Sequence, residues 1–186
     1  VVNAATKKYD GFFTPETKEL KISIDNKQNI IEYKYDRKSY SLTINPNTGV
    51  YDGKTENAII NDVKFGATID LKIPSRQGYT FAGWEIVGKN TETISNTKLT
   101  MGTEDTTITA KWEANKYLVT LNPNGGKLTE TTKEVVYDEE YGTLATPTRL
   151  GYTFEGWYTQ AEGGEEVKST DIVKITEDIT LYAHWK

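Results

Sequence analysis

Few residues of this chain have side chains of a kind that could carry out catalysis. The 186 residues include one histidine, His184, and no cysteine. The lack of cysteine excludes disulfide frameworks, thiol nucleophiles and cysteine-based zinc sites, and a serine–histidine–aspartate triad could use only His184. The acidic pairs 139–140 and 165–166 could serve in general acid–base catalysis. No partner recurs beside them, so we interpret them as solvated charges.

The overall composition excludes further functions. The net charge is -5 and the isoelectric point about 5.1, which argues against the clustered basic surface that phosphate binding requires. No apolar run approaches the roughly 18 residues of a membrane span. The acidic residues do not follow the Asp-x-Asp-x-Asp-Gly spacing of a calcium loop. We therefore expect no nucleic-acid partner, no membrane insertion, no metal site and no cofactor.

Three segments recur in the same order, which indicates a tandem repeat. Two of the copies lie 73 residues after the originals, and the other lies 77 residues after. The pairs are YSLTINPNTG at 40–49 with YLVTLNPNGG at 117–126, GYTFAGW at 78–84 with GYTFEGW at 151–157, and EDTTITAKW at 104–112 with EDITLYAHW at 177–185. We assign residues 39–114 to repeat 1 and residues 115–186 to repeat 2.

Residues 1–38 are not a full third copy. The segment 11–13, Gly-Phe-Phe, is similar to the start of the Gly-Tyr-Thr-Phe motif, and the apolar residues of 31–35 alternate as a last strand would. Tyr35 precedes repeat 1 by the same spacing by which Trp112 precedes repeat 2. We interpret residues 1–38 as the C-terminal part of a preceding, diverged β module.

The repeats are rich in the β-favouring residues Thr, Tyr, Ile and Val. In repeat 1, Tyr40, Leu42 and Ile44 alternate with polar residues, which predicts a half-buried strand. Further strands are expected near 58–65, 79–81 and 106–112, a turn at 45–49 with positive φ at Asn and Gly, and hairpins at 88–90 and 163–164. The predicted fold class is mostly β, in small tandem modules arranged as an elongated string.

Aromatic rings are expected to stabilise each module, because a domain of about 75 residues buries little apolar surface. Each repeat has a set of rings at positions patterned for the core. They are Tyr40, Phe65, Tyr79, Phe81, Trp84 and Trp112 in repeat 1, and Tyr117, Tyr141, Tyr152, Phe154, Trp157 and Trp185 in repeat 2. We expect these rings to dominate the core, and the tryptophans to face inward rather than to form a sugar-binding platform.

These motifs resemble the Listeria–Bacteroides repeat family, the family of the internalin B-repeat. The resemblance covers residues 40–186 and rests on Gly-Tyr-Thr-Phe-x-Gly-Trp, on the Asp-x-Thr-x-x-Ala-x-Trp ending, and on the strand and turn that lead each repeat. It implies an incomplete ubiquitin-like β-grasp fold, in tandem modules of bacterial surface proteins, with no catalytic residues. Residues 1–38 resemble the end of a mucin-binding-protein-like module.

Residues that differ between the two copies are expected on the surface. His184 has Lys111 at its position in repeat 1, which favours a solvated residue over a ligand or base. Tyr158 and Tyr182 replace a Glu and a Thr of repeat 1, so these rings are the candidate surface for binding.

The sequence thus predicts a non-enzymatic spacer and adhesion segment of a bacterial cell-surface protein. The protein is expected outside the cell, wall-anchored or secreted, with a monomeric chain whose stacked β modules project a binding domain. The alternative is a binding module for a host protein or glycan. An enzyme is the weakest hypothesis, because no nucleophile recurs beside a base.

Overall fold

The computed structural model describes residues 1–87 and 94–186, and it confirms the mostly-β class. Apart from one 3-10 turn, η1 (Asn26–Gln28), the regular elements of these residues are strands. The strands are β1 (Val2–Ala4), β2 (Lys18–Leu20), β3 (Ser39–Asn45), β4 (Ala58–Lys64), β5 (Thr68–Asp70), β6 (Tyr79–Val87), β7 (Lys98–Thr100), β8 (Thr106–Ala114), β9 (Lys116–Asn122), β10 (Thr132–Val136), β11 (Phe154–Tyr158), β12 (Glu166–Val167) and β13 (Ile179–Trp185). The described residues contain no helix long and apolar enough to cross a membrane.

The chain divides into two compact units. The first consists of residues 1–74 and 83–111, and the second of residues 75–82 and 112–186. The Gly-Tyr-Thr-Phe segment of repeat 1 therefore belongs to the second unit. The repeat boundaries predicted from the sequence stay a prediction.

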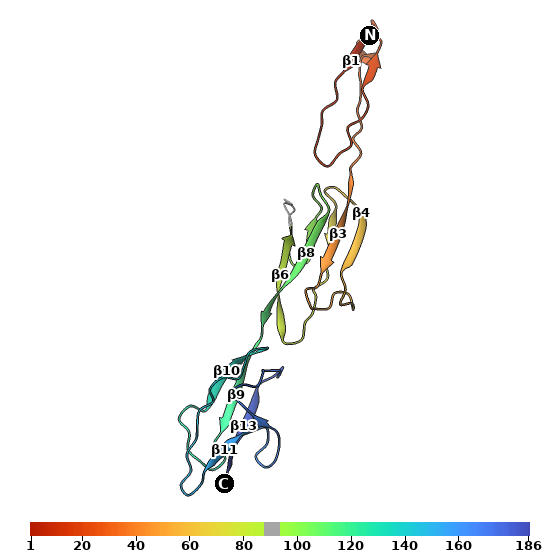
Figure 1. The fold of residues 1–186 in the computed structure, drawn as a ribbon. Helices are drawn as coiled ribbons and strands as arrows, with labels where there is room; N and C mark the ends of the chain where they lie inside the picture. The colour runs from red at the N-terminus through yellow and green to blue at the C-terminus, as the bar shows by residue number, and fades with distance from the viewer. Residues whose placement is uncertain (88–93) are drawn as a thin grey trace. The chain divides into compact units, whose positions relative to one another are not determined.

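Both repeats have the same strand order (Figure 1). It is β4-β3-β8-β6 in repeat 1 and β10-β9-β13-β11-β12 in repeat 2. The first and last strands of each repeat pair in parallel, with Ile44 opposite Ile108 and Leu121 opposite Leu181. The first strand is antiparallel to the second strand on its other side. The centre of each sheet is therefore a parallel pair, which holds the EDTTITAKW and EDITLYAHW endings.

The centre of each core is aliphatic rather than aromatic. Residues at most 2% exposed are Leu42, Ile44, Ile108 and Ala110 in repeat 1, and Val119, Leu121, Leu181 and Ala183 in repeat 2. The expectation that the twelve rings dominate the core is wrong: only Trp84, Tyr141 and Trp157 among them are buried, and Tyr152 is 51% exposed. Inward-pointing branched side chains of the parallel strands fill the narrow centre, so the remaining rings, Trp112 and Trp185 included, lie at its margins and are only half-buried.

The turn after the first strand of each repeat has the geometry of a type I′ turn. In 46–49 and 123–126, the last N–H donates to the first carbonyl at 2.9 Å. The two central residues have positive φ, 48° and 66° in repeat 1 and 46° and 86° in repeat 2. The predicted turn is present, but in repeat 1 the second left-handed residue is Thr48, where repeat 2 has Gly125. The glycine that the sequence pattern assigned to this role closes the turn instead.

Residues 31–35 do not form the predicted last strand. Near the N-terminus the backbone pairing is between β1 and β2, which form a two-stranded antiparallel sheet. The Tyr33 hydroxyl donates to the Ala4 carbonyl at 2.8 Å and accepts the Lys18 N–H at 3.0 Å. Alternation predicts the face that a side chain takes but supplies no partner strand. Tyr33 is therefore attached to the β1–β2 sheet through its hydroxyl rather than by backbone pairing.

One of the two predicted hairpins is confirmed. β11 and β12 pair antiparallel, and across the loop the Thr159 N–H donates to the Glu165 carbonyl at 3.0 Å. Gly163 and Gly164 have φ values of 69° and 78°, the left-handed conformation that glycine accepts without strain. The other predicted hairpin, at 88–90, lies outside the described residues.

Candidate functional site

Tyr158 and Tyr182, the two rings predicted for binding, lie opposite each other on adjacent strands. β11 and β13 pair antiparallel with these two residues as partners. Directly opposed residues of paired strands have their side chains on the same face of the sheet. Both rings are half-buried. The structure thus brings the predicted pair together, and binding at this surface stays a prediction.

His184 lies beside the same surface. Its ring stacks on Tyr158 with the ring centroids 3.8 Å apart and the planes at 9°. The His184 Nε2 lies 3.0 Å from the Gln160 carbonyl oxygen. The prediction of a solvated residue is therefore only partly correct, because a half-buried stacked imidazole has replaced the free side chain expected from Lys111.

The acidic pairs are solvated, as the sequence predicts. Glu139, Glu140, Glu165 and Glu166 are all exposed. The Glu166 carboxylate lies 3.4 Å from the Lys168 ammonium, an ion pair of two largely solvated groups. Within the described ranges, no group of three or more His, Asp or Glu side chains is placed to hold a metal ion.

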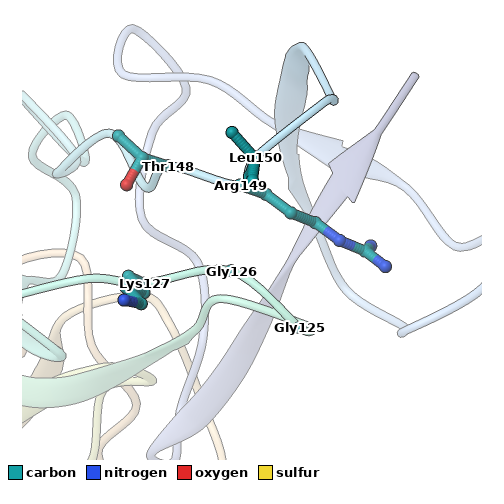
Figure 2. A pocket seen from close by; sticks show the side chains of 6 residues that line it. All are labelled: Gly125, Gly126, Lys127, Thr148, Arg149 and Leu150. Carbon is teal, nitrogen blue, oxygen red and sulfur yellow. The ribbon is translucent and has the colours of Figure 1, made fainter.

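Two open hollows lie beside the glycine-rich turn of repeat 2. Figure 2 shows the first, which is lined by residues 125–127 and 148–150. These two segments pair through backbone hydrogen bonds of 2.7 and 2.9 Å. The Arg149 side chain extends away from Leu150 in Figure 2, and it also lines the second hollow with Tyr152 and His184. Both hollows therefore border the segment 149–152.

That segment is one of three copies of a four-residue turn. In each copy the N–H of the fourth residue donates to the carbonyl of the first, and a glycine with positive φ occupies the third position, as a type II turn requires. The copies are Tyr9–Phe12 (3.3 Å, Gly11 φ 76°), Arg76–Tyr79 (3.1 Å, Gly78 φ 75°) and Arg149–Tyr152 (3.2 Å, Gly151 φ 81°). In the last two, the guanidinium of the first residue lies over the ring of the fourth, at 3.7 and 4.0 Å from its centroid.

In the first unit, this turn packs on the ring of Phe65. The Lys38 N–H donates to the Gly11 carbonyl at 2.8 Å, and the Phe65 N–H donates to the Lys38 carbonyl at 2.9 Å. A Cβ atom on Gly11 would lie 2.3 Å from the Phe65 ring. The Phe12 and Phe65 rings meet edge to face at 5.5 Å. Only glycine fits here, because its α-hydrogen takes the place of a side chain over the ring.

The second unit contains the same arrangement with other residues. The Asn115 N–H donates to the Gly78 carbonyl, and the Tyr137 N–H donates to the Asn115 carbonyl, both at 2.9 Å. A Cβ atom on Gly78 would lie 2.4 Å from three atoms of the Tyr137 ring. The Tyr79 and Tyr137 rings meet edge to face at 5.6 Å. We call this arrangement the glycine–ring contact; it joins residues of repeat 1 to residues of repeat 2 inside one compact unit.

The second unit adds polar groups to the contact. The Tyr79 hydroxyl donates to Asp138 Oδ2 at 2.7 Å, and the Lys174 ammonium donates to Asp138 Oδ1. The hydrogen bonds from Lys174 and then from Tyr79 lower the pKa of Asp138, and the hydrogen bond to Asp138 raises the pKa of Tyr79. In the first unit Phe12 and Gly66 occupy these two positions, so the hydroxyl and the carboxylate are both missing there.

Sequence reasoning missed Tyr137 and misjudged Phe65, which it treated as an ordinary core ring. Both residues directly follow the second strand of their repeat, and each is followed by a residue with positive φ, Gly66 at 72° and Asp138 at 67°. The available signal was that Phe65 and Tyr137 lie 72 residues apart, close to the repeat length. The polar insertion after Gly49 shifts the numbering and conceals the match.

Two known repeat domains match this chain. Residues 117–184 match the sequence model of the Listeria–Bacteroides repeat domain, and residues 40–116 match that of the divergent InlB B-repeat domain. The prediction of two tandem copies of this kind is therefore confirmed. Neither match includes residues 1–38, so their resemblance to a mucin-binding-protein-like module stays a prediction.

Similar proteins include two from Evansella cellulosilytica and one from Listeria monocytogenes. A protein described as a Gly-rich membrane protein is 38% identical over 60% of this chain and 13% of its own length, and one described as a membrane protein is 32% identical over 85% and 23%. Internalin H is 34% identical over 60% of this chain and 20% of its own length. The chain therefore spans less than a quarter of each of these relatives.

Proposed function

We propose that these internalin-type repeats form a non-enzymatic spacer in a bacterial cell-surface protein, outside the cell and wall-anchored or secreted. The monomeric chain would hold a binding domain away from the cell. The glycine–ring contact carries this proposal, because it recurs in both units with the same backbone hydrogen bonds and the same edge-to-face rings. The parallel pairing of first and last strands supports the β-grasp-like assignment of each repeat.

The mechanism follows from what a spacer must resist. A link of four residues alone would let two modules pivot, since short loops close at little entropic cost. The hydrogen bonds from Asn115 to Gly78 and from Tyr137 to Asn115 fix this link at its centre. The packed rings of Tyr79 and Tyr137 add apolar contact away from that axis. Together they would restrict pivoting, which a flexible linker could not do.

The test measures a distance between the repeats. Because the chain lacks cysteine, spin labels can be attached to Cys at the exposed positions Asn61 and Glu162. We expect a narrow distance distribution in the parent chain and a broad one in Gly78→Asn. Asparagine accepts the left-handed conformation, so the variant keeps the turn but places a Cβ against Tyr137.

Gly53→Asn is the matched control, because Gly53 also has positive φ, at 78°, but has nothing within 4 Å of a Cβ position. It should leave the distribution unchanged. A distribution in the parent chain that is as broad as in Gly78→Asn would contradict the spacer proposal.

A second function is favoured by the surface of Tyr158 and Tyr182. Paired rings on adjacent strands, with His184 stacked beside them, offer an aromatic platform to a glycan or a host protein. The test is binding to a glycan array and to host cells by the parent chain and by the variant Tyr158→Glu with His184→Lys. This variant restores the residue pair of repeat 1, so the sheet should stay folded. Equal binding by both proteins would reject the platform.

A further inference from the structure

We propose that the turn Arg149–Tyr152 is a docking surface for the aromatic ring of a further repeat module joined after Lys186. The occupant would be a Phe or Tyr that directly follows the second strand of that module, as Phe65 and Tyr137 do. This inference rests on the proposed spacer function and extends it to a surface that the described contacts leave open.

The third turn is built like the two turns that carry rings, but it carries none. Gly11 and Gly78 are buried, whereas Gly151 is exposed and has nothing within 4 Å of a Cβ position. Tyr152 is 51% exposed, and Leu150 in the middle of the turn is fully exposed. The same turn is therefore present without the ring that covers its equivalents.

The aromatic side of the docking surface is already arranged. The Arg149 guanidinium lies 4.0 Å over the Tyr152 ring, close to the 3.7 Å between Arg76 and the Tyr79 ring. This stacking holds Tyr152 in place before any partner arrives, which reduces the conformational entropy lost on docking. The ring edge and the α-hydrogen of Gly151 remain for the incoming ring.

The chain end lies where a following module would need it. Thr153 and Lys186 exchange backbone hydrogen bonds of 2.8 and 2.9 Å, so Lys186 is beside the turn. Lys186 occupies the position of Glu113 in repeat 1, and the residue that bonds to the Gly78 carbonyl is Asn115, two places later. The second residue after Lys186 would therefore reach the Gly151 carbonyl in the same way.

Tyr152 also selects between two kinds of module. Where the turn ends in Phe12, the residue after the partner ring is Gly66; where it ends in Tyr79, that residue is Asp138, which accepts the hydroxyl hydrogen bond. A turn that ends in Tyr152 therefore fits a module with an aromatic residue followed by Asp, in the left-handed conformation that Asp tolerates.

The experiment extends the chain by a second copy of residues 114–186 after Lys186, and it reads the glycine α-protons by NMR. A proton over the face of an aromatic ring is shifted upfield. Gly11 and Gly78 are internal references, and both should be shifted in the 186-residue chain, where Gly151 should not. In the extended chain Gly151 should shift upfield as well.

Two variants sharpen the result. Gly151→Asn should separate the added copy from the turn in the extended chain and leave the spectrum of the 186-residue chain otherwise intact; Gly163→Asn, at another open positive-φ position, should do neither. Gln77→Leu makes the occupied turn identical to Arg149–Tyr152, so the Gly78 shift should persist in it.

The outcomes separate the inference from the proposed function. Unshifted Gly11 and Gly78 protons would remove the glycine–ring contact and with it the spacer proposal. Shifted Gly11 and Gly78 protons with an unshifted Gly151 in the extended chain, or loss of the Gly78 shift in Gln77→Leu, would overturn only the docking surface.

Discussion

The two repeats have the same inner sheet face and different outer faces. Ala110 and Ala183 are both fully buried at matching positions of the last strand. One residue further on, Lys111 forms an ion pair of 3.4 Å with Glu85 in repeat 1, whereas in repeat 2 the equivalent His184 stacks on Tyr158. Packing density limits what the inner face accepts, while the outer face can exchange one kind of pair for another without a change in strand pairing.

The largest expected effect is the loss of an inner tryptophan. Trp157 is 3% exposed and its indole N–H donates to the Ala145 carbonyl at 3.0 Å. Trp157→Ala should lower the free energy of unfolding by about 3–5 kcal/mol, because it leaves a large cavity and an unsatisfied carbonyl. We expect repeat 2 to unfold first, as followed by hydrogen exchange during urea denaturation.

Trp84→Ala is the companion variant in repeat 1. Trp84 is 9% exposed and donates instead to the Asn96 carbonyl, on the opposite side in the sequence. It should destabilise the first unit in the same way. A loss below about 1 kcal/mol for either variant would show that the rings are dispensable and that the shared inner face does not decide stability.

A smaller effect is expected at the type I′ turns. Thr48 has φ 66°, an unfavourable conformation for a β-branched residue, where repeat 2 has Gly125. Thr48→Gly should stabilise repeat 1 by about 0.5–1 kcal/mol, and Gly125→Thr should destabilise repeat 2 by about 1–2 kcal/mol. Chemical denaturation of both variants checks the signs. Changes of the same sign in both would mean that the two turns are not equivalent.

The strands of the sheet could be predicted from the sequence because each depends on a local signal. The alternation of Tyr40, Leu42 and Ile44 located β3, and the recurrence of its pattern located β9. The aliphatic centre of the core could not be assigned by the same reasoning. Ring size indicates how much area a residue can bury, but the pairing of the parallel strands decides which side chains meet at the centre.

The glycine–ring contact was beyond sequence reasoning for a different reason. Gly78 and Tyr137 lie far apart in the chain, and their contact depends on the backbone of Asn115 between them. A conserved turn motif explains the positive φ of Gly78 without any partner. Only the structure shows that the missing side chain is also needed for a ring.

A weaker effect should distinguish the outer-face pairs by their response to salt. The Glu85 and Lys111 side chains are 56% and 52% exposed, so their coupling should be below about 1 kcal/mol and should fall further as ionic strength rises. The stacked pair of Tyr158 and His184 should retain about 0.5–1.5 kcal/mol at high salt. Double-mutant cycles at two salt concentrations measure both. Equal salt dependence would show that stacking adds nothing beyond charge.

The smallest expected effect is a pH dependence confined to one of the two glycine–ring contacts. The hydrogen bonds from Lys174 and Tyr79 lower the pKa of Asp138 below its ordinary value of 3.8. A carboxylate whose folded-state pKa is lowered stabilises the fold above the unfolded-state value, and this stabilisation is lost as the pH falls toward the folded-state value. The ring-current shift of Gly78 should therefore weaken below pH 3.8, while that of Gly11 stays constant.

Asp138→Gly is the matched control, because it reproduces the residue of the first unit and keeps the left-handed conformation. The Gly78 shift should become as insensitive to acid as that of Gly11. If acid weakens both contacts equally, the polar groups around Tyr79 contribute nothing specific. The difference between the two contacts would then lie in their rings alone, and the selection of an Asp-bearing module by Tyr152 would lose its physical basis.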